Sequence, residues 1–326
     1  MPDGGAAGHA TPLDSYRVIA NPAAPGASAG RRSGERADMR RVVPSGEARG
    51  PGDGNKRYRP MIMDFDTRAN TLSTEIRDDW TPAIRDQWRK NIENIHQELS
   101  AEFGQRDFAT KLQNFKDLGA KPFSVLAYHN KFLAQARSAF VMSAYYPALV
   151  GACTLGERIL NHLVIKLRDD FKSSTHYKHI YKKSSFDKWP KMIDALADWN
   201  VLIPEAAADF VKLNARRNDC VHFRHDLDRD ARAPALEAIQ LLEAIIQRQF
   251  SAFGANSWFI PGTLGASFLR RDVETLPFIR LVFIPNSFLV SNRHQMHFTA
   301  GGLLVTDEVL ESVEDLTDEQ FAMGDI

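Results

Sequence analysis

The stretch Pro204–Asp226, PEAAADFVKLNARRNDCVHFRHD, decides how the rest of this chain is interpreted. It opens with proline and glutamate, a pair typical of a first helical turn. Proline lacks only a donor that would have no partner there, and the acid suits the positive end of a helix. Apolar residues then recur at spacings near three and four, which predicts one helix of about five turns. They are Ala208, Phe210, Val211, Leu213 and Val221.

An arginine, an amide and a histidine lie close together near the end of this helix. Asn218 and His222 are four residues apart, so they share a helix face. Arg217 lies five residues before His222, about 140° around the axis, so only its long side chain could bring the guanidinium near the imidazole. Anion binding and titration near neutral pH are thus combined in a short segment. Arg216 is a rival for the role of Arg217.

The composition is that of an ordinary globular protein of 326 residues, 44% hydrophobic. The 41 basic and 41 acidic residues balance, so any binding to nucleic acid requires a local basic patch. The two cysteines, Cys153 and Cys220, fit no metal spacing and are expected to be small buried hydrophobes. No apolar stretch is long enough to cross a bilayer and no secretory signal is visible, so we expect a cytoplasmic protein without membrane contact.

Composition and periodicity divide the chain into five parts. The first is rich in Gly, Ala, Pro, Ser and Arg and too poor in apolar residues to offset ordering entropy, so we expect it to be disordered. A translation start at Met39, Met61 or Met63 is an alternative explanation for it. Amphipathic helices follow, then a block that is helical throughout, a small β-rich element and an acidic tail. The expected boundaries are 1–59, 60–121, 122–254, 255–306 and 307–326.

The helical parts have short connections, which favours an antiparallel bundle. In the second part, Thr81-Pro82 predicts the start of a long helix whose continuous apolar stripe needs a partner surface. In the third part, periodicity predicts four helices besides the opening stretch. They span residues 123–143, 146–171, 186–199 and 233–253.

The C-terminal part has a different character. Residues 278–284, FIRLVFI, have strand propensity, and 287–291, 294–299 and 303–306 predict further short strands of a β-meander. Residues 307–326 hold eight acids and no Lys or Arg, which is typical of a solvated or docking tail. The expected fold class is therefore mainly α: an antiparallel helical bundle with N-terminal helices and a small C-terminal β-meander.

The motif and its place on the fourth helix of a bundle resemble the HEPN superfamily of nucleotide-binding domains. Ribonuclease members carry Arg, a polar residue, and then His four to six residues after the Arg, which here corresponds to Arg217, Asn218 and His222. Glu157 and Asn161, an i,i+4 pair on the second helix of the block, match polar positions that often face the motif helix. The resemblance covers only the block of residues 122–254.

The resemblance implies a metal-independent endoribonuclease of defence or stress response that needs no cofactor. His222 would take the proton of an RNA 2′-hydroxyl, Arg217 would stabilise charge on the phosphate, and Asn218 would orient His222 or hold a phosphate oxygen. The products would be a 2′,3′-cyclic phosphate and a 5′-hydroxyl. Active members work as homodimers with two motifs across a two-fold axis. Some toxin members carry a tyrosine two residues after the histidine that a partner enzyme can nucleotidylate; Arg224 stands there, so we do not expect that mode of silencing. No nucleotidyltransferase motif is evident elsewhere in the chain, so any antitoxin would be a separate protein.

Structural roles are the alternative for the same residues. Arg217 could pair with Glu157, and His222 could only cap a carbonyl, in a catalytically silent module that binds RNA, nucleotide or a protein. An exposed pair of Arg217 and His222 facing each other favours the enzyme. A buried pair satisfied by Glu157 and Asn161 favours the module.

Two further clusters carry residue types that suit binding. The basic connector between the second and third helices of the block could track RNA phosphates and stack bases, with a solvated loop as the alternative. Its candidate RNA-binding residues are Lys178, Tyr181, Lys182 and Lys183. His294 and His297 are three apart on an expected strand and point to opposite faces, so we expect no metal site there.

Overall fold

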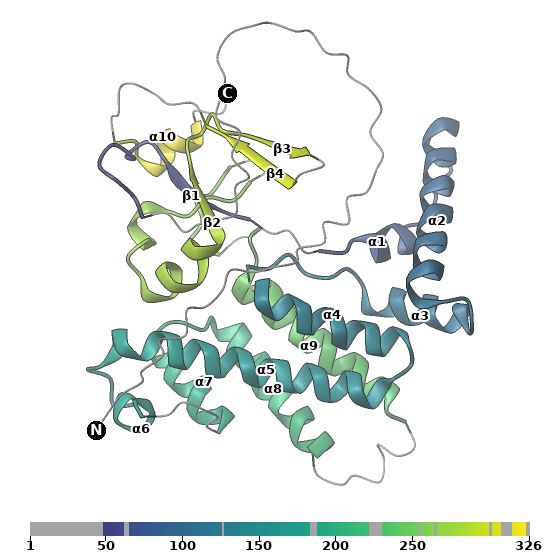
Figure 1. Cartoon of the computed structure of the whole chain (residues 1–326), viewed down its shortest axis with the longest axis horizontal. Helices are drawn as coiled ribbons and strands as arrows, with labels where there is room; N and C mark the ends of the chain where they lie inside the picture. The colour runs from purple at the N-terminus through teal and green to yellow at the C-terminus, as the bar shows by residue number, and fades with distance from the viewer. Residues whose placement is uncertain are drawn as a thin grey trace, which may run out of the picture.

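The computed structural model of the chain is mainly helical, with a helical bundle and a smaller lobe that holds the strands (Figure 1). The expected mainly α fold class is confirmed. The structure describes residues 48–61, 65–125, 127–182, 188–221, 230–253, 256–263, 266–299, 302–307 and 315–323.

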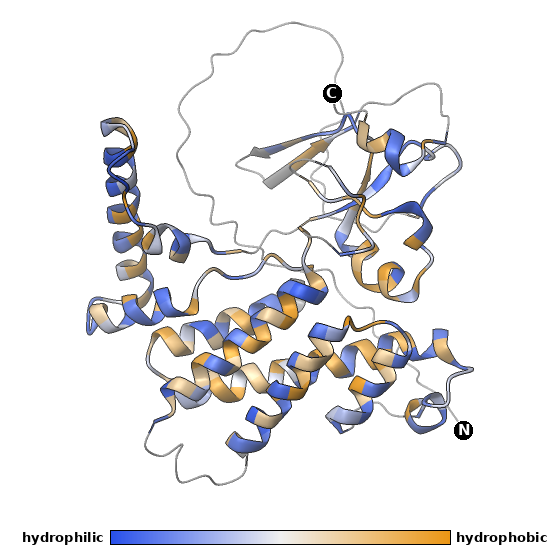
Figure 2. Cartoon of the chain, turned by 180° about the vertical axis from the view of Figure 1, so that it is seen from behind, coloured by the Kyte–Doolittle hydropathy of each residue, from blue (hydrophilic) through white to orange (hydrophobic). Residues whose placement is uncertain are grey.

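Within the described residues, five helices form the bundle, with α5 at its centre. Helix α5 (Tyr145–Leu167) contacts α4 (Ala127–Val141), α7 (Trp189–Asp198), α8 (Pro204–Val221) and α9 (Arg232–Phe250). Each helix carries both hydrophobic and hydrophilic residues (Figure 2), and the hydrophobic ones form one buried core. The helices expected from periodicity are present, with ends shifted by a few residues.

A glycine in α5 allows α7 and α8 to approach it closely. A Cβ atom at Gly156 would lie 2.7 Å from Leu213 of α8 and 2.8 Å from Trp189 of α7, so any larger residue would push these helices away. The next residue is Glu157, and this close approach brings α7 and α8 to its side chain.

Helix α5 together with η1 (Arg168–Phe171) is apolar enough to resemble a membrane span. Among the described helices, the segment Tyr145–Phe171 meets that criterion, with a mean hydropathy of 1.2 over the window. However, 56% of the window is buried inside the protein. Its position at the centre of the bundle accounts for its apolar character.

Three N-terminal helices form an arm beside the bundle: α1 (Arg68–Ser73), α2 (Pro82–Phe103) and α3 (Phe108–Leu118). The predicted start of α2 is confirmed, because the Thr81 side chain accepts a hydrogen bond from the Ile84 backbone N–H at 3.4 Å. The expected partner surface covers only the second half of α2. Ile95 and Leu99 are buried, whereas Ile84 is 49% exposed.

The smaller lobe contains two separate antiparallel sheets of two strands. β1 (Arg57–Pro60) pairs with β2 (Ser287–Val290), and β3 (Gln295–Thr299) pairs with β4 (Gly302–Thr306). The expected single meander is therefore wrong for the described residues. Consecutive strands usually pair, but β2 pairs with a strand from the other end of the chain.

Residues 278–284, expected as a strand, are helical. The π-helix η3 (Ile279–Phe283) leads into the 3-10 helix η4 (Ile284–Asn286), and η2 (Arg271–Val273) precedes them. Packing of one helical face into the core outweighs the strand propensity of these residue types. The buried residues of this face are Phe278, Ile279, Val282 and Phe283.

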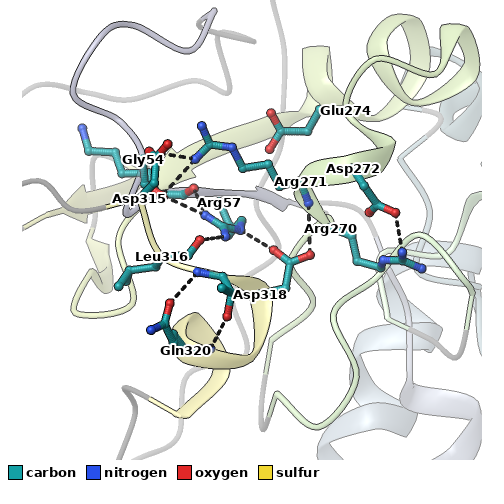
Figure 3. Close-up of polar contacts among 12 residues, drawn as sticks. Gly54, Arg57, Arg270, Arg271, Asp272, Glu274, Asp315, Leu316, Asp318 and Gln320 are labelled. Atoms are coloured by element: carbon teal, nitrogen blue, oxygen red, sulfur yellow. Dashed lines mark hydrogen bonds and ion pairs between the residues drawn. The ribbon is translucent and has the colours of Figure 1, made fainter.

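Charged contacts tie both ends of the described chain into this lobe (Figure 3). Arg57 is fully buried and donates to Asp318 at 2.6 Å, and its guanidinium lies over the ring of Phe321. Phe321 is itself buried, in α10 (Asp318–Met323). The end of the segment expected to be disordered thus forms β1, and residues 315–323 of the tail, which we expected to be solvated or docking, pack into the lobe. Local composition predicts neither β1 nor the packing of α10, because the residues that each contacts are remote in sequence.

The core of the bundle extends into the lobe, which also has a small hydrophobic cluster of its own around Phe268 and Phe321. Phe278 packs against Phe250 of α9, with ring centroids 6.0 Å apart. At the edge of the contact, Arg280 donates to Asp170 of η1 at 2.5 Å. The lobe therefore lies against the end of α5 that is remote from its first turn.

Candidate functional site

Arg217 lies on the side of α8 that faces α5. Its Nη2 atom is 3.7 Å from Oε2 of Glu157, and the two side chains are 29% and 25% exposed. Its Nη1 atom also donates to Oδ1 of Asn218 at 3.3 Å. The arginine is thus partly accessible and held by a long ion pair, which contributes less than a short, fully buried one.

Glu157 is oriented by a second donor. The indole Nε1–H of Trp189, at the start of α7, donates to the same Oε2 atom at 3.3 Å. Trp189 is 1% exposed, so its ring holds the carboxylate in place from the core side. The sequence did not identify Trp189 as part of this site; it lay inside the predicted helix 186–199, beside Pro190, and nothing local linked it to Glu157.

The last described turn of α8 is anchored on α5. The hydroxyl of Tyr146 donates to the carbonyl oxygen of Cys220 at 3.4 Å, and the Cys220 thiol donates to the carbonyl oxygen of Arg217 at 3.1 Å. Cys153 of α5 lies within hydrogen-bond reach of Cys220. Burial raises the pKa of both thiols, so the expectation of small buried hydrophobes is confirmed.

Arg216 points to a different neighbour from Arg217. It donates to Glu237 of α9 at 2.8 Å and to Asp219 at 3.4 Å. These carboxylates raise its pKa, chiefly through the hydrogen bond that Arg216 donates to Glu237. Of the two adjacent arginines, Arg217 is therefore the one beside the expected polar position of α5, and Arg216 joins α8 to α9.

The remaining motif residues differ in their placement. Asn218 is exposed on the described part of α8. Asn161 donates to the carbonyl oxygen of Glu157 at 2.9 Å, so its amide bonds to its own helix and does not reach Arg217. His222 follows the last described residue of α8, and with Arg224 it lies outside the described residues.

The basic connector forms a separate cluster at the far end of α5. Helix α6 (Tyr177–Ile180) stacks Tyr177 on Tyr181 with centroids 5.7 Å apart, and Lys182 lies over the Tyr181 ring. Lys178 is exposed beside them, and Lys183 lies outside the described residues. Glu157 precedes the end of α5 by ten residues, about 15 Å of helix. The structure therefore does not bring this cluster together with Arg217.

Histidines and carboxylates do not gather into a metal site in the described part of the chain, where no group of three or more His, Cys, Asp or Glu could hold an ion. No family model, no curated protein and no solved structure matches this chain.

Proposed function

We propose that this protein is a metal-independent endoribonuclease of HEPN type, acting in the cytoplasm in defence or stress response. Arg217 binds the scissile phosphate, His222 takes the proton from the RNA 2′-hydroxyl, and Asn218 orients the phosphate or the imidazole. The observation that carries the proposal is the partly exposed Arg217 guanidinium, held beside Glu157 on α8. His222 is the next residue in sequence after Val221, the last residue of this helix.

The chemistry follows from these residue types. A neutral imidazole accepts the 2′-hydroxyl proton as that oxygen attacks phosphorus, and the P–O5′ bond then breaks. The guanidinium stabilises the extra negative charge of the transition state. The leaving 5′-oxygen must gain a proton, and the His222 of a second copy supplies it in an isologous dimer. The products are a 2′,3′-cyclic phosphate and a 5′-hydroxyl.

The contacts of Arg217 are consistent with binding an incoming phosphate. A phosphate offers two oxygens to the planar guanidinium, whereas Glu157 offers one at 3.7 Å. Exchange of one anion for the other requires only a side-chain movement, because Glu157 keeps its bond from Trp189. Glu157 then orients the arginine in the free protein.

A catalytically silent module that binds RNA, nucleotide or a protein is the second candidate. The ion pair between Arg217 and Glu157 favours it, because it gives the arginine a structural role. Against it, Asn161 does not contribute to that pair, and Arg217 is not buried.

The experiment compares the two adjacent arginines. Purified full-length protein is incubated with RNA in the presence of a chelator, as wild type, Arg217→Ala and Arg216→Ala. Loss of the transition-state contact to phosphate lowers the cleavage rate of Arg217→Ala by about 10²-fold or more. Arg216→Ala, which breaks only the contacts with Glu237 and Asp219, keeps most of the activity. If both folded variants cleave RNA as wild type does, Arg217 is structural and the module is the better account.

A further inference from the structure

A small cavity lies where the first turn of α4, the second half of α5 and the segment η3–η4 meet. Its volume is about 20 Å³, enough for one water or one anion oxygen. Its polar lining consists of His129 from α4, His162 and Lys166 from α5, and Asn286 from η4. None of the described residues that line it is acidic.

The histidines come together at the closed side of this cavity. The ring of His129 is 1% exposed and meets the ring of His162 edge-to-face, with centroids 5.2 Å apart. His162 and Lys166 are exposed on their other sides. The cavity thus has the buried His129 imidazole at its base, and the side chains of His162 and Lys166 at its mouth.

Basic groups follow one another along this side of α5. Arg158, His162 and Lys166 recur every four residues, so they form one row on the helix. The guanidinium of Arg158 lies over the ring of Phe132 on α4, 4.9 Å from its centroid, which fixes it beside the row.

The charges that act on the histidines are positive. Burial, and then the charges of His162 and Arg158, lower the pKa of His129 to about 3. Burial also lowers the pKa of His162, followed by the charges of Arg158 and Lys166. A neutral imidazole carries one N–H donor and one acceptor, so at neutral pH it can still donate to an anion. The cavity mouth therefore has positive potential with no carboxylate in its lining.

We propose that this cavity is the binding site of a phosphate group, with one oxygen inside against His129 and the others at the mouth against His162 and Lys166. A complete phosphate exceeds the cavity, so only one oxygen enters. Mobile lysine donors suit a phosphate held at such an opening. The phosphate belongs either to a free nucleotide or to an RNA backbone, and the two sources share this chemistry.

This site is distinct from the Arg217 site and does not depend on it. At 100° per residue, His162 and Lys166 lie about 140° and 180° around α5 from Glu157. The two clusters therefore face different sides of the helix.

The test is calorimetric titration of the full-length protein with inorganic phosphate, a nucleoside 5′-monophosphate and a short RNA at low ionic strength. The variants are Lys166→Met, His162→Gln, Arg217→Ala and the control Lys172→Met, an exposed lysine of equal charge just beyond η1. We expect Lys166→Met and His162→Gln to weaken phosphate binding about fivefold or more, because each loses a donor to a charged group. Lys172→Met should leave phosphate binding within about twofold. Lys166→Met should weaken it by the same factor in an Arg217→Ala background, where the proposed catalytic phosphate contact is absent.

Each outcome decides the proposal. Nucleotide binding that depends on Lys166 identifies a free nucleotide as the source, and RNA binding with the same dependence identifies a backbone. If wild type binds no phosphate, or if Lys166→Met binds as tightly as Lys172→Met, the proposal is overturned. The proposed RNA cleavage can fail or succeed independently, because the Lys166→Met comparison is repeated in protein that lacks the Arg217 guanidinium.

Discussion

The buried ion pair between Arg137 of α4 and Glu243 of α9 leads to a quantitative stability prediction. Their side chains are 7% and 10% exposed, and Arg137 also donates to the carbonyl oxygen of Gly119 at 2.6 Å. Burial raises the pKa of Glu243 to about 7, an effect that Arg137 and then Lys121 oppose. The pair joins α4, α9 and the end of α3 where little water can stabilise a lone charge.

The two single substitutions have different consequences. Glu243→Met leaves a buried guanidinium that cannot lose its proton, so we expect the free energy of unfolding to fall by about 3–5 kcal/mol. Arg137→Met leaves a carboxyl whose pKa is already raised by burial and rises further without its cation. The folded state then binds the extra proton, so this variant is less destabilised at acid pH and loses stability as pH rises from about 4.5 to beyond 7.

The double variant isolates the interaction. Two methionines of similar volume replace the charges with apolar contacts, so we expect a cost of about 0–2 kcal/mol, well below the sum of the single costs. Urea unfolding followed by circular dichroism measures the free energy of unfolding of the wild type, both single variants and the double variant. Arg89→Met is the control, because Arg89 and Asp86 form an ion pair that is 60% and 73% exposed and is worth about 1 kcal/mol at most. Additive single costs, or a Glu243→Met cost as small as the control, would refute the reasoning.

Three other predictions concern the remaining parts of the protein. Because burial lowers the pKa of His129 to about 3, the unfolded state takes up this proton first, and stability falls as pH drops below about 6.5. The free energy of unfolding is lower by about 2 kcal/mol near pH 5. Urea unfolding should show a smaller loss between about pH 6.5 and 5 for His129→Gln than for wild type, and an equal loss would contradict the prediction. A chain that starts at Met61 lacks β1 and should melt at least about 5 °C below one that starts at residue 48. Equal melting temperatures would show that β1 contributes nothing. Phe321→Ala should cost about 3 kcal/mol, and an unchanged urea midpoint would show that α10 is not docked.

The helices could be predicted because their signals are local. Pro204 at the start of α8 and Thr81-Pro82 at the start of α2 mark the first turns of these helices through local backbone chemistry. The repeated three-and-four spacing of apolar residues then reports a face that a core must cover. These signals need no knowledge of remote partners, so the bundle helices were expected close to where they lie.

The lobe could not be predicted in the same way. Strand β1 and helix α10 depend on each other and on β2, through the contacts of Arg57 with Asp318 and Phe321. The composition of the sequence around β1 or around α10 does not indicate those contacts. In η3, Val282 and Phe283 have strand propensity, but their burial against the core selects a helix.

At the candidate site, the sequence placed some residues better than others. Glu157 was expected to face the motif helix, and it lies beside Arg217. Asn161 was expected to do the same, but an amide four residues further along can bond to its own helix, and it does. The contribution of Trp189 depends on packing that Gly156 permits, which no local pattern reveals.

The most direct test of the proposed ribonuclease compares two RNA substrates with and without His222. One is a short RNA that the wild type cleaves, and the other carries a single 2′-deoxy substitution at the cleaved position. In chelator, the account predicts cleavage of the first to a 2′,3′-cyclic phosphate and a 5′-hydroxyl, no cleavage of the second at that position, and neither reaction with folded His222→Ala. Cleavage of the deoxy substrate at that position, or undiminished cleavage by His222→Ala, would contradict it.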